Sequence, residues 1–281
     1  MMAARASFLL SRTLLSFAVP GTGLFPDISL IILEVKMVGF NSGVQLSAQE
    51  RSSFIGKTYG WMSLALFVSA FVSFFAANAV FGEDGRLSRF GMVLFGNGMI
   101  GFWVLAIAEF VVVMWLSSMI RKISFGTAAI GFFVYAVLNG ITLSTIFIVY
   151  RISSIASAFF GSAAMFAIMS WYGATTKKNL SSFGKYLMMA LIGIIIANVV
   201  QFILHLVTGN PMTFLNFLIS VASVAVFTGL TAYDTQKLFR IAESANGSDD
   251  YQKISILAAL ELYLDFINLF LAVLRIFGKR R

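Results

Sequence analysis

The chain has no cysteine, one histidine and three prolines among its 281 residues. Without cysteine it can form neither a disulfide nor a thiolate nucleophile or metal ligand. One histidine excludes zinc sites built from several histidines. Charged residues make up 11% of the chain, whereas about a quarter is usual in soluble domains. These absences leave no basis for a thiol-dependent or zinc-dependent enzyme.

Long apolar runs dominate what is present. Hydrophobic residues make up 59% of the chain and its mean hydropathy is +0.90, outside the balance of a soluble domain. A helix that crosses a bilayer needs about 20 mainly apolar residues, and continuous rather than alternating runs exclude a membrane β-barrel. The sequence predicts an all-α, polytopic membrane protein with seven transmembrane helices, at approximately 58–81, 90–119, 125–149, 154–173, 184–208, 212–240 and 252–277.

The segments before these runs complete the domain organisation. Residues 58–281 form one predicted membrane domain, and residues 37–57 form a polar lead-in. Residues 1–36 can be interpreted as a secretory signal, as an organellar transit peptide, or as a non-native extension upstream of a natural start at Met37. We favour the extension, because such segments specify little structure.

The basic residues indicate the orientation of the chain in the membrane rather than nucleic-acid binding. The net charge is +8, but lysine and arginine lie in short connections and in the tail, where orientation and anionic lipid headgroups explain them. Basic residues after the second, fourth and sixth spans favour a cytoplasmic N-terminus. Seven crossings would then place the tail, 279–281, outside; a last helix that does not fully cross would remove this conflict. The expected location is a bacterial inner membrane, or an organellar membrane in a eukaryote.

The run Ile254–Phe277 is long enough to cross a bilayer, yet one of its faces is polar. Glu261, Asp265 and Asn268 follow one another at spacings of four and three, which places them on one side of a helix. A carboxylate at the centre of a membrane costs at least about 2.5–3.5 kcal/mol, so such groups turn toward the protein interior. We therefore expect the last helix to be central, with the other helices around it.

Two more acids lie inside predicted spans. Asp234 lies in the sixth, and Glu109 in the second, twelve residues before Arg121 at the end of that helix. Glu109 is either a functional acid or a protonated carboxyl hydrogen-bonded between helices. Counted from the turn after the sixth span, Asp234 and Asp265 differ in depth by roughly 8 Å at 1.5 Å per residue. The sequence leaves their contact open.

Uncharged polar and small residues predict how the helices pack. A seam of hydrogen bonds between helices, in preference to an ion or proton path, is expected along the polar face of the fifth span, which carries Asn198, Gln201 and His205. Small side chains let helices approach closely. We expect this role for Gly131, Gly140, Gly161 and Ala163.

Two segments carry a resemblance to a known family. They are TGLTAYDTQKL at residues 228–238 and ALELYLDFINLFLAVLRIFG at residues 259–278, in the last two spans of a seven-span chain. In this order they resemble the Bax inhibitor-1 family, also called transmembrane Bax inhibitor motif proteins. The resemblance runs from about Arg51 to the C-terminus, and its most specific part is the string LYLDFINLFL.

The resemblance implies a non-enzymatic membrane protein that leaks Ca²⁺ in a pH-dependent way, with a seven-helix fold around its last helix. It implies a pH-sensing aspartate pair, which corresponds here to Asp234 and Asp265, and a part for an acid and a cation of the second helix, which Glu109 and Arg121 match by position. Glu261 departs from the family, where Ser or Asn is common. The implied partners are Ca²⁺ as the permeant ion, protons and the lipid bilayer, without a tightly bound cofactor.

Physical chemistry supports a gate at these acids. Two carboxyls held close in a poorly hydrated site cannot both ionise at small cost, so they share a proton. The shared proton ties helix six to helix seven, and its loss replaces the tie with repulsion and attracts a divalent cation, which Asp234 and Asp265 would contact transiently. Glu109 and Glu261 are further candidates for the conduction path, with Arg121 as counter-charge.

Other classes stay open at this point. An ion-coupled transporter also uses acids inside the membrane, but it predicts an internal repeat, and none is clear. A regulatory protein that binds another membrane protein, such as a protease or a cell-death regulator, is a second alternative. An intramembrane hydrolase lacks a convincing nucleophile and base. Acids that only join helices by hydrogen bonds are the simplest alternative.

Overall fold

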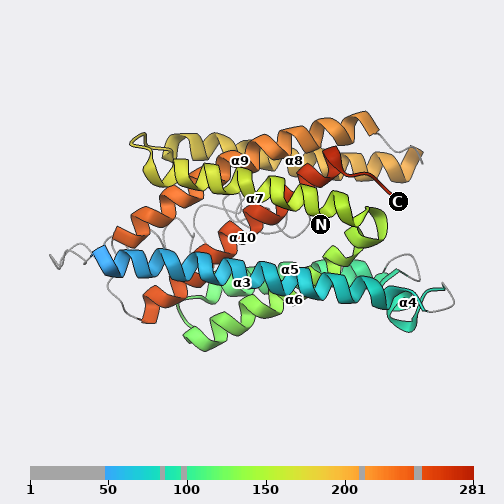
Figure 1. Ribbon diagram of the computed structural model, residues 1–281, viewed down its shortest axis with the longest axis horizontal. Helices are drawn as coiled ribbons and strands as arrows, with labels where there is room; N and C mark the ends of the chain where they lie inside the picture. The colour runs from blue at the N-terminus through green and yellow to red at the C-terminus, as the bar shows by residue number, and fades with distance from the viewer. Residues whose placement is uncertain (1–47, 83–85, 96–99, 209–212, 244–248) are drawn as a thin grey trace, which may run out of the picture.

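A computed structural model describes residues 48–82, 86–95, 100–208, 213–243 and 249–281. This part of the chain is helical, with short connections (Figure 1). Seven of its helices are long and apolar enough to cross a membrane, which confirms the predicted fold class. The helices are α3 (Ala48–Val80), α4 (Arg89–Phe95), α5 (Ile100–Met119), α6 (Phe125–Val149), α7 (Ile152–Thr175), α8 (Ser181–Thr208), α9 (Thr213–Glu243) and α10 (Asp249–Phe277).

The helix ends differ from the predicted spans by more than three residues at two places. Within the described residues α3 extends back to Ala48, so it includes the second half of the polar lead-in. The second predicted span is divided into the short α4 and the longer α5, and residues 96–99 between them lie outside the described part. Hydropathy locates the apolar part of a helix, but it does not register polar turns that continue beyond the bilayer.

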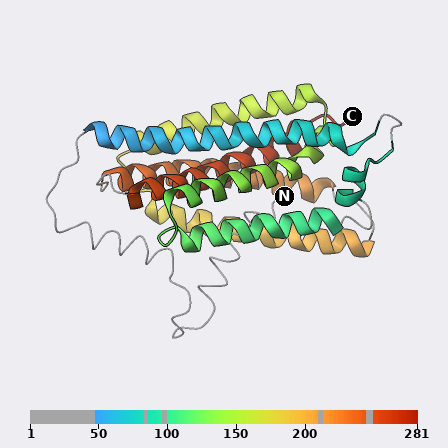
Figure 2. The same cartoon turned by 90° about the horizontal axis from the view of Figure 1, so that it is seen from below.

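The last helix is the most buried of the seven candidate spans. The most apolar part of α10 is 89% buried, compared with 22–50% in the other six. α10 packs against α3, α6, α7 and α9. Figures 1 and 2 show it running between a group formed by α3, α5 and α6 and a group formed by α7, α8 and α9. The outer helices present large apolar side chains outward, such as Phe67 and Phe160, as expected for surfaces that face lipid.

Glycines allow two of the closest helix contacts. A Cβ atom added at Gly140 would lie 2.8 Å from the carbonyl oxygen of Ser69, where α6 meets α3. One added at Gly131 would lie 2.7 Å from the Trp115 ring. The packing role predicted for these two glycines is confirmed. The same prediction is wrong for Gly161, because nothing lies within 4 Å of its added Cβ, so this residue faces open space.

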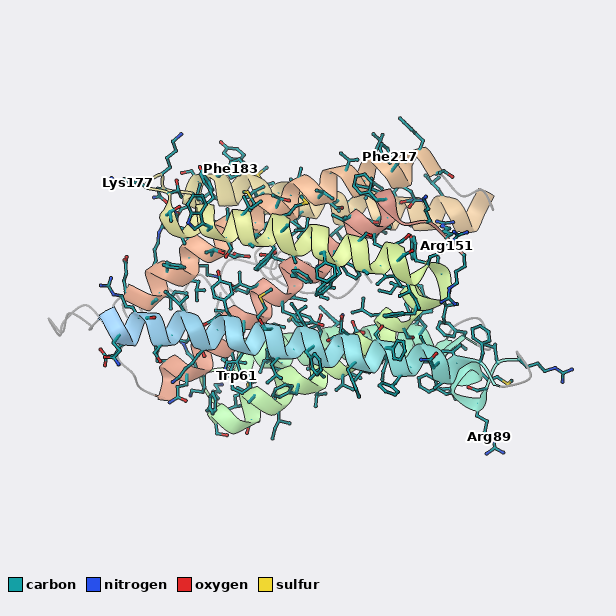
Figure 3. The ribbon with its side chains drawn as sticks, viewed as in Figure 1. Trp61, Arg89, Arg151, Lys177, Phe183 and Phe217 are labelled. Atoms are coloured by element: carbon teal, nitrogen blue, oxygen red, sulfur yellow. The ribbon has the colours of Figure 1, made fainter. Side chains whose placement is uncertain are left out.

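The connections gather at two opposite ends of the bundle. At one end, the Lys253 ammonium on α10 donates to the Arg121 carbonyl oxygen over 3.4 Å. At the other, the Arg151 N–H, between α6 and α7, donates to the Lys279 carbonyl oxygen over 3.1 Å. Figure 3 shows Lys177 at the first end and Arg89 and Arg151 at the second. The last helix therefore runs the full length of the bundle.

Candidate functional site

An ion pair joins α9 to α10. The Lys237 ammonium lies 2.9 Å from Oε2 and 3.0 Å from Oε1 of Glu261, and both side chains are largely buried, at 16% and 11% exposure. The sequence placed Lys237 at an aqueous boundary and Glu261 among the acids of the conduction path. The structure gives Glu261 a cationic partner inside the helix interface.

This ion pair fixes the register of the two helices. Asp234 lies three residues before Lys237, and Asp265 lies four residues after Glu261. Because consecutive α9 and α10 run in opposite directions, both steps lead away from the connecting turn, by about 4.5 and 6 Å. Around the helix axes, Asp234 is turned by only about 60° from Lys237, and Asp265 by only about 40° from Glu261. Counted from the ion pair, Asp234 and Asp265 therefore lie at similar depths, and their contact stays a prediction.

Counting from the ion pair gives a smaller difference in depth than the roughly 8 Å obtained by counting from the turn. That estimate assumed that the two helices begin level with each other at the turn. Lys237 lies six residues before the end of α9 at Glu243, whereas Glu261 lies twelve residues after the start of α10 at Asp249. α10 thus begins about 9 Å further out than α9 ends.

The surroundings of the two aspartates are poorly hydrated. Asp265 is 0% exposed, and Asp234 is half-buried. The neighbours of Asp234 on α9, Thr231 and Thr235, are also 0% exposed. Low hydration is one of the conditions for proton sharing between carboxyls, and closeness is the other. The sharing itself stays a prediction.

Glu109 is in a different place, between α5 and α6. It is 1% exposed. The Thr142 hydroxyl donates to Glu109 Oε1, and the Asn139 amide donates to Oε2 over 3.4 Å. Both donors come from α6, one turn apart. The carboxyl that the sequence offered as part of a conduction path is thus held by hydrogen bonds between two helices.

The hydrogen bonds of Glu109 continue to α10 and α3. The Tyr263 hydroxyl on α10 donates to Asn139 Oδ1 over 3.1 Å and lies 2.7 Å from the Ser69 hydroxyl of α3. Ser69 in turn lies 2.7 Å from the Ala136 carbonyl oxygen. Sequence reasoning missed Ser69 and Tyr263, although a tyrosine inside the specific LYLDFINLFL string was a usable signal.

This chain of contacts accommodates a neutral Glu109. Ser69 and Tyr263 have one hydroxyl hydrogen each, which is too few for the contacts to Ala136, to each other and to Asn139. If the Asn139 amide turns over, Asn139 donates to Tyr263, Tyr263 to Ser69, and Ser69 to Ala136. Asn139 Oδ1 then faces Glu109 and accepts a hydrogen bond from its protonated carboxyl.

Arg121 lies far from the two aspartates. Its side chain is exposed just beyond α5, and its carbonyl oxygen accepts from Lys253. Lys253 precedes Asp265 by twelve residues on α10, about 18 Å at 1.5 Å per residue. The role of Arg121 as a counter-charge stays a prediction.

A second polar cluster, which the sequence did not suggest, joins α3, α7 and α9. We call it the hydroxyl cluster, and it consists of Tyr59, Ser170 and Thr235. The Ser170 hydroxyl lies 3.0 Å from that of Thr235 and within hydrogen-bond distance of that of Tyr59. Thr235 follows Asp234 in the sequence, so the hydroxyl cluster holds the part of α9 that carries this acid. Nothing in the spacing of these residues brings them together before folding.

The connection between α7 and α8 is fastened to the end of α9. The Gln236 side chain accepts from the Leu180 N–H over 2.9 Å and donates to the Lys178 carbonyl oxygen over 2.8 Å. The Arg240 guanidinium donates to Asn179 Oδ1 and to the Ser181 hydroxyl, both over 2.7 Å. Gln236 and Arg240 lie four residues apart, so they share one face of α9 and can both reach this connection.

The expected seam on α8 is partly described. Asn198 donates to the Ile194 carbonyl oxygen of its own helix over 2.6 Å, and Gln201 is buried. The side chain of His205 lies outside the described residues. The described bond of Asn198 therefore stays within α8.

Together these features define a class: multi-pass membrane proteins in which a buried helix carries acids toward its neighbours. Comparisons with known proteins then identify the family. The family model described as "Inhibitor of apoptosis-promoting Bax1" matches residues 51–281. The chain belongs to this family, the Bax inhibitor-1 family.

Bacterial relatives agree with this assignment. The chain is 46% identical over 233 residues to "Inner membrane protein YbhL" of Escherichia coli K12, covering 82% of this chain and 92% of the relative. It is 37% identical over 232 residues to a protein of Borreliella burgdorferi, covering 82% and 94%. It is 36% identical over 230 residues to a membrane protein of Streptococcus pyogenes serotype M1, covering 81% and 93%. The chain is a multi-pass integral membrane protein of the bacterial inner-membrane type.

Proposed function

We propose that this protein is a pH-sensitive calcium leak channel, gated by a proton that Asp234 and Asp265 share. The observation that carries the proposal is the Lys237–Glu261 ion pair, because counting residues from it gives the two aspartates similar depths along α9 and α10. Membership of the Bax inhibitor-1 family supports the same function. The proposal needs no tightly bound cofactor.

The gate works through the attachment of α9 to α10. While one proton is shared, a carboxyl-to-carboxylate hydrogen bond holds the two helices together. When the proton leaves, two negative charges face each other where Asp265 has no access to water, and their repulsion is screened little. The helices separate locally, and the exposed oxygens attract Ca²⁺, which prefers carboxylate ligands. Calcium flux should therefore rise with pH.

The ion pair next to the aspartates limits how far the helices can separate. Lys237 and Glu261 lie about one turn from Asp234 and Asp265 on their helices, on the side of the connecting turn. In this mechanism Glu261 restrains the gate rather than binding the permeant ion. Glu109 is held by donors from α6, and its part in the proposal is to connect α5 to the helices around α10.

Calcium flux into liposomes tests the proposal. Full-length protein is reconstituted into vesicles that contain a calcium-sensitive dye, and flux is measured across a pH series. Asp234→Asn and Asp265→Asn each remove one partner of the shared proton, so we expect flux that no longer responds to pH. Glu243→Gln, at an exposed position near the end of α9, is the matched control and should retain the response. An unchanged pH response in both aspartate variants would reject the gate.

A further inference from the structure

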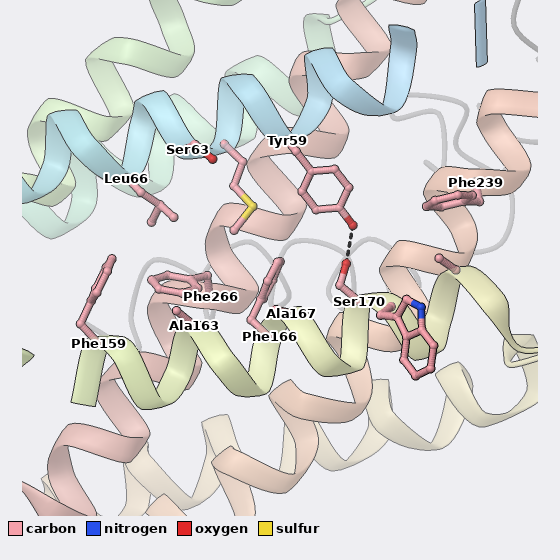
Figure 4. Close-up of a pocket in the computed structure, with 13 residues that line it drawn as sticks. Tyr59, Ser63, Leu66, Phe159, Ala163, Phe166, Ala167, Ser170, Phe239 and Phe266 are labelled. Atoms are coloured by element: carbon pink, nitrogen blue, oxygen red, sulfur yellow. Dashed lines mark hydrogen bonds between the residues drawn. The ribbon is translucent and has the colours of Figure 1, made fainter. Parts of the chain in front are cut away.

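A groove opens between α3 and α7, with α10 as its floor (Figure 4). Its volume is about 490 Å³. The lining is mainly apolar and aromatic, with Leu66 from α3, Phe159 and Ala163 from α7, and Phe266 from α10. Tyr59 and Ser170, two members of the hydroxyl cluster, provide polar groups at one end. Neither the sequence nor the proposed function assigns a role to this groove.

The position of the groove selects lipid as the occupant. α3 and α7 are outer helices, and they expose Phe67 at 68% and Phe160 at 72%. Such surfaces belong in the hydrocarbon region of a bilayer. A groove that opens between them is therefore surrounded by acyl chains rather than by water.

The dimensions of the groove fit one acyl chain. From Phe159 to Ala174 its lining follows α7 for fifteen residues, about 22 Å, which is shorter than the roughly 30 Å thickness of the hydrocarbon core. The groove is therefore long enough to hold one acyl chain along α7.

The polar end of the groove lies where a headgroup belongs. Ser170 is five residues before the end of α7, and its neighbour Trp171 is 70% exposed. Lys177 and Lys178 follow directly after the helix. Aromatic residues followed by cations mark the level of lipid headgroups, and clustered lysines attract anionic lipids. The polarity of the groove thus matches the polarity of a phospholipid, with the headgroup outside and the chain toward the midplane.

We propose that this groove is a binding site for an anionic phospholipid of the surrounding leaflet, with one acyl chain between α3 and α7 and the headgroup near Ser170, Lys177 and Lys178. Tyr59 and Ser170 provide hydroxyl groups for the ester region at the entrance. The proposal concerns lipid binding alone and does not depend on calcium conduction, so each can fail without the other.

Groove-filling substitutions test the site. Delipidated full-length protein in detergent is titrated with palmitoyl-oleoyl phosphatidylglycerol, and bound lipid is counted by native mass spectrometry. Ala163→Phe places a ring in the groove, and Ala164→Phe adds the same ring at the next, exposed residue of α7 outside the lining. The ring takes up space that the acyl chain would occupy, so lipid binding should weaken. We expect this loss for Ala163→Phe and unchanged binding for Ala164→Phe.

A second substitution and a second lipid complete the experiment. Ala167→Phe fills the groove from an exposed position, so it serves if Ala163→Phe does not fold. Palmitoyl-oleoyl phosphatidylcholine should bind more weakly than phosphatidylglycerol, and Lys177→Gln with Lys178→Gln should remove this difference. Retained binding in both groove variants, an equal loss in Ala164→Phe, or equal binding of the two lipids to the unmodified protein would overturn the proposal.

Discussion

Tyr263 and Asp265 lie two positions apart on α10 and face opposite sides of it, because two residues turn a helix by about 200°. On one side, the Tyr263 hydroxyl lies 3.1 Å from the Asn139 side chain of α6. On the other, Asp265 follows Glu261, which is paired with Lys237 of α9. The last helix therefore carries two distinct polar sites: one connects it to α3, α5 and α6, and the other connects it to α9. Experiments can address them separately.

Tyr263→Phe should affect stability without affecting the pH response. Loss of the hydroxyl leaves Asn139 without one of its partners inside the protein, which costs about 1–3 kcal/mol. We expect a lower unfolding temperature in detergent, whereas the pH at half-maximal calcium flux stays that of the unmodified protein. Ser118→Ala is the control, since its exposed hydroxyl bonds only within α5. A shifted flux midpoint in Tyr263→Phe would show that the two sides of α10 are coupled.

Substitutions in the ion pair should shift the flux midpoint in opposite directions. Glu261→Gln leaves the charge of Lys237 uncompensated one turn from the aspartates, which favours their ionised form. The proton then leaves at lower pH, and the flux curve moves to lower pH. Lys237→Met leaves the charge of Glu261 uncompensated, which disfavours ionisation, so the curve moves to higher pH.

The exchanged pair, Lys237→Glu with Glu261→Lys, controls for loss of the contact. It should return the midpoint toward that of the unmodified protein and recover part of the lost stability. Breaking a fully buried pair costs about 3–5 kcal/mol, and the residual exposure of these side chains reduces the expected cost to about 2 kcal/mol. Shifts of equal sign in the two single variants would contradict the placement of the aspartates beside the pair.

Much of the fold follows from the sequence, because the bilayer imposes a length and a composition on each helix. The ends of α6 and α10 fall within three residues of their predicted positions. The sequence did not predict the start of α3, because its first turns are helical but polar, and hydropathy detects only apolar turns. The acids on α10 were recognised as inward-facing, since lipid excludes charge. These inferences need only one helix at a time.

The remainder of the site depends on how helices meet, which hydropathy does not encode. From the sequence alone, Lys237 is interpreted as a cation at the membrane boundary. Only the packing of α9 on α10 brings it against Glu261. Tyr59, Ser170 and Thr235 come from three helices and share no spacing in the sequence. Gly161 and Gly173 are on the same helix, yet only the second contacts a neighbouring backbone. Such differences arise from helix rotation and crossing, which vary without changing the hydrophobic pattern.

This difference between the two glycines of α7 gives a matched pair of variants. A Cβ atom at Gly173 would lie 2.2 Å from the Ala232 carbonyl oxygen of α9, and one at Gly161 would contact nothing. Gly173→Val should therefore force α7 and α9 apart, at a cost of about 1–3 kcal/mol or more. Gly161→Val should leave the unfolding temperature almost unchanged. Equal unfolding temperatures for the two variants would show that α7 does not approach α9 as closely as described.

Glu109 should tolerate replacement by glutamine but not by alanine. Glutamine can accept from Thr142 through its oxygen and donate through its amide to Asn139 Oδ1, which reproduces the contacts of a protonated Glu109. Alanine removes one partner from each of the two buried α6 side chains, which keep Leu138 and Tyr263 as their others, and an unpaired buried group costs about 1–3 kcal/mol. We expect an unfolding temperature near that of the unmodified protein for Glu109→Gln and a marked decrease for Glu109→Ala. If glutamine destabilises the protein as much as alanine, Glu109 is held in its ionised form, and the contacts from Ser69 to Asn139 do not turn over as inferred.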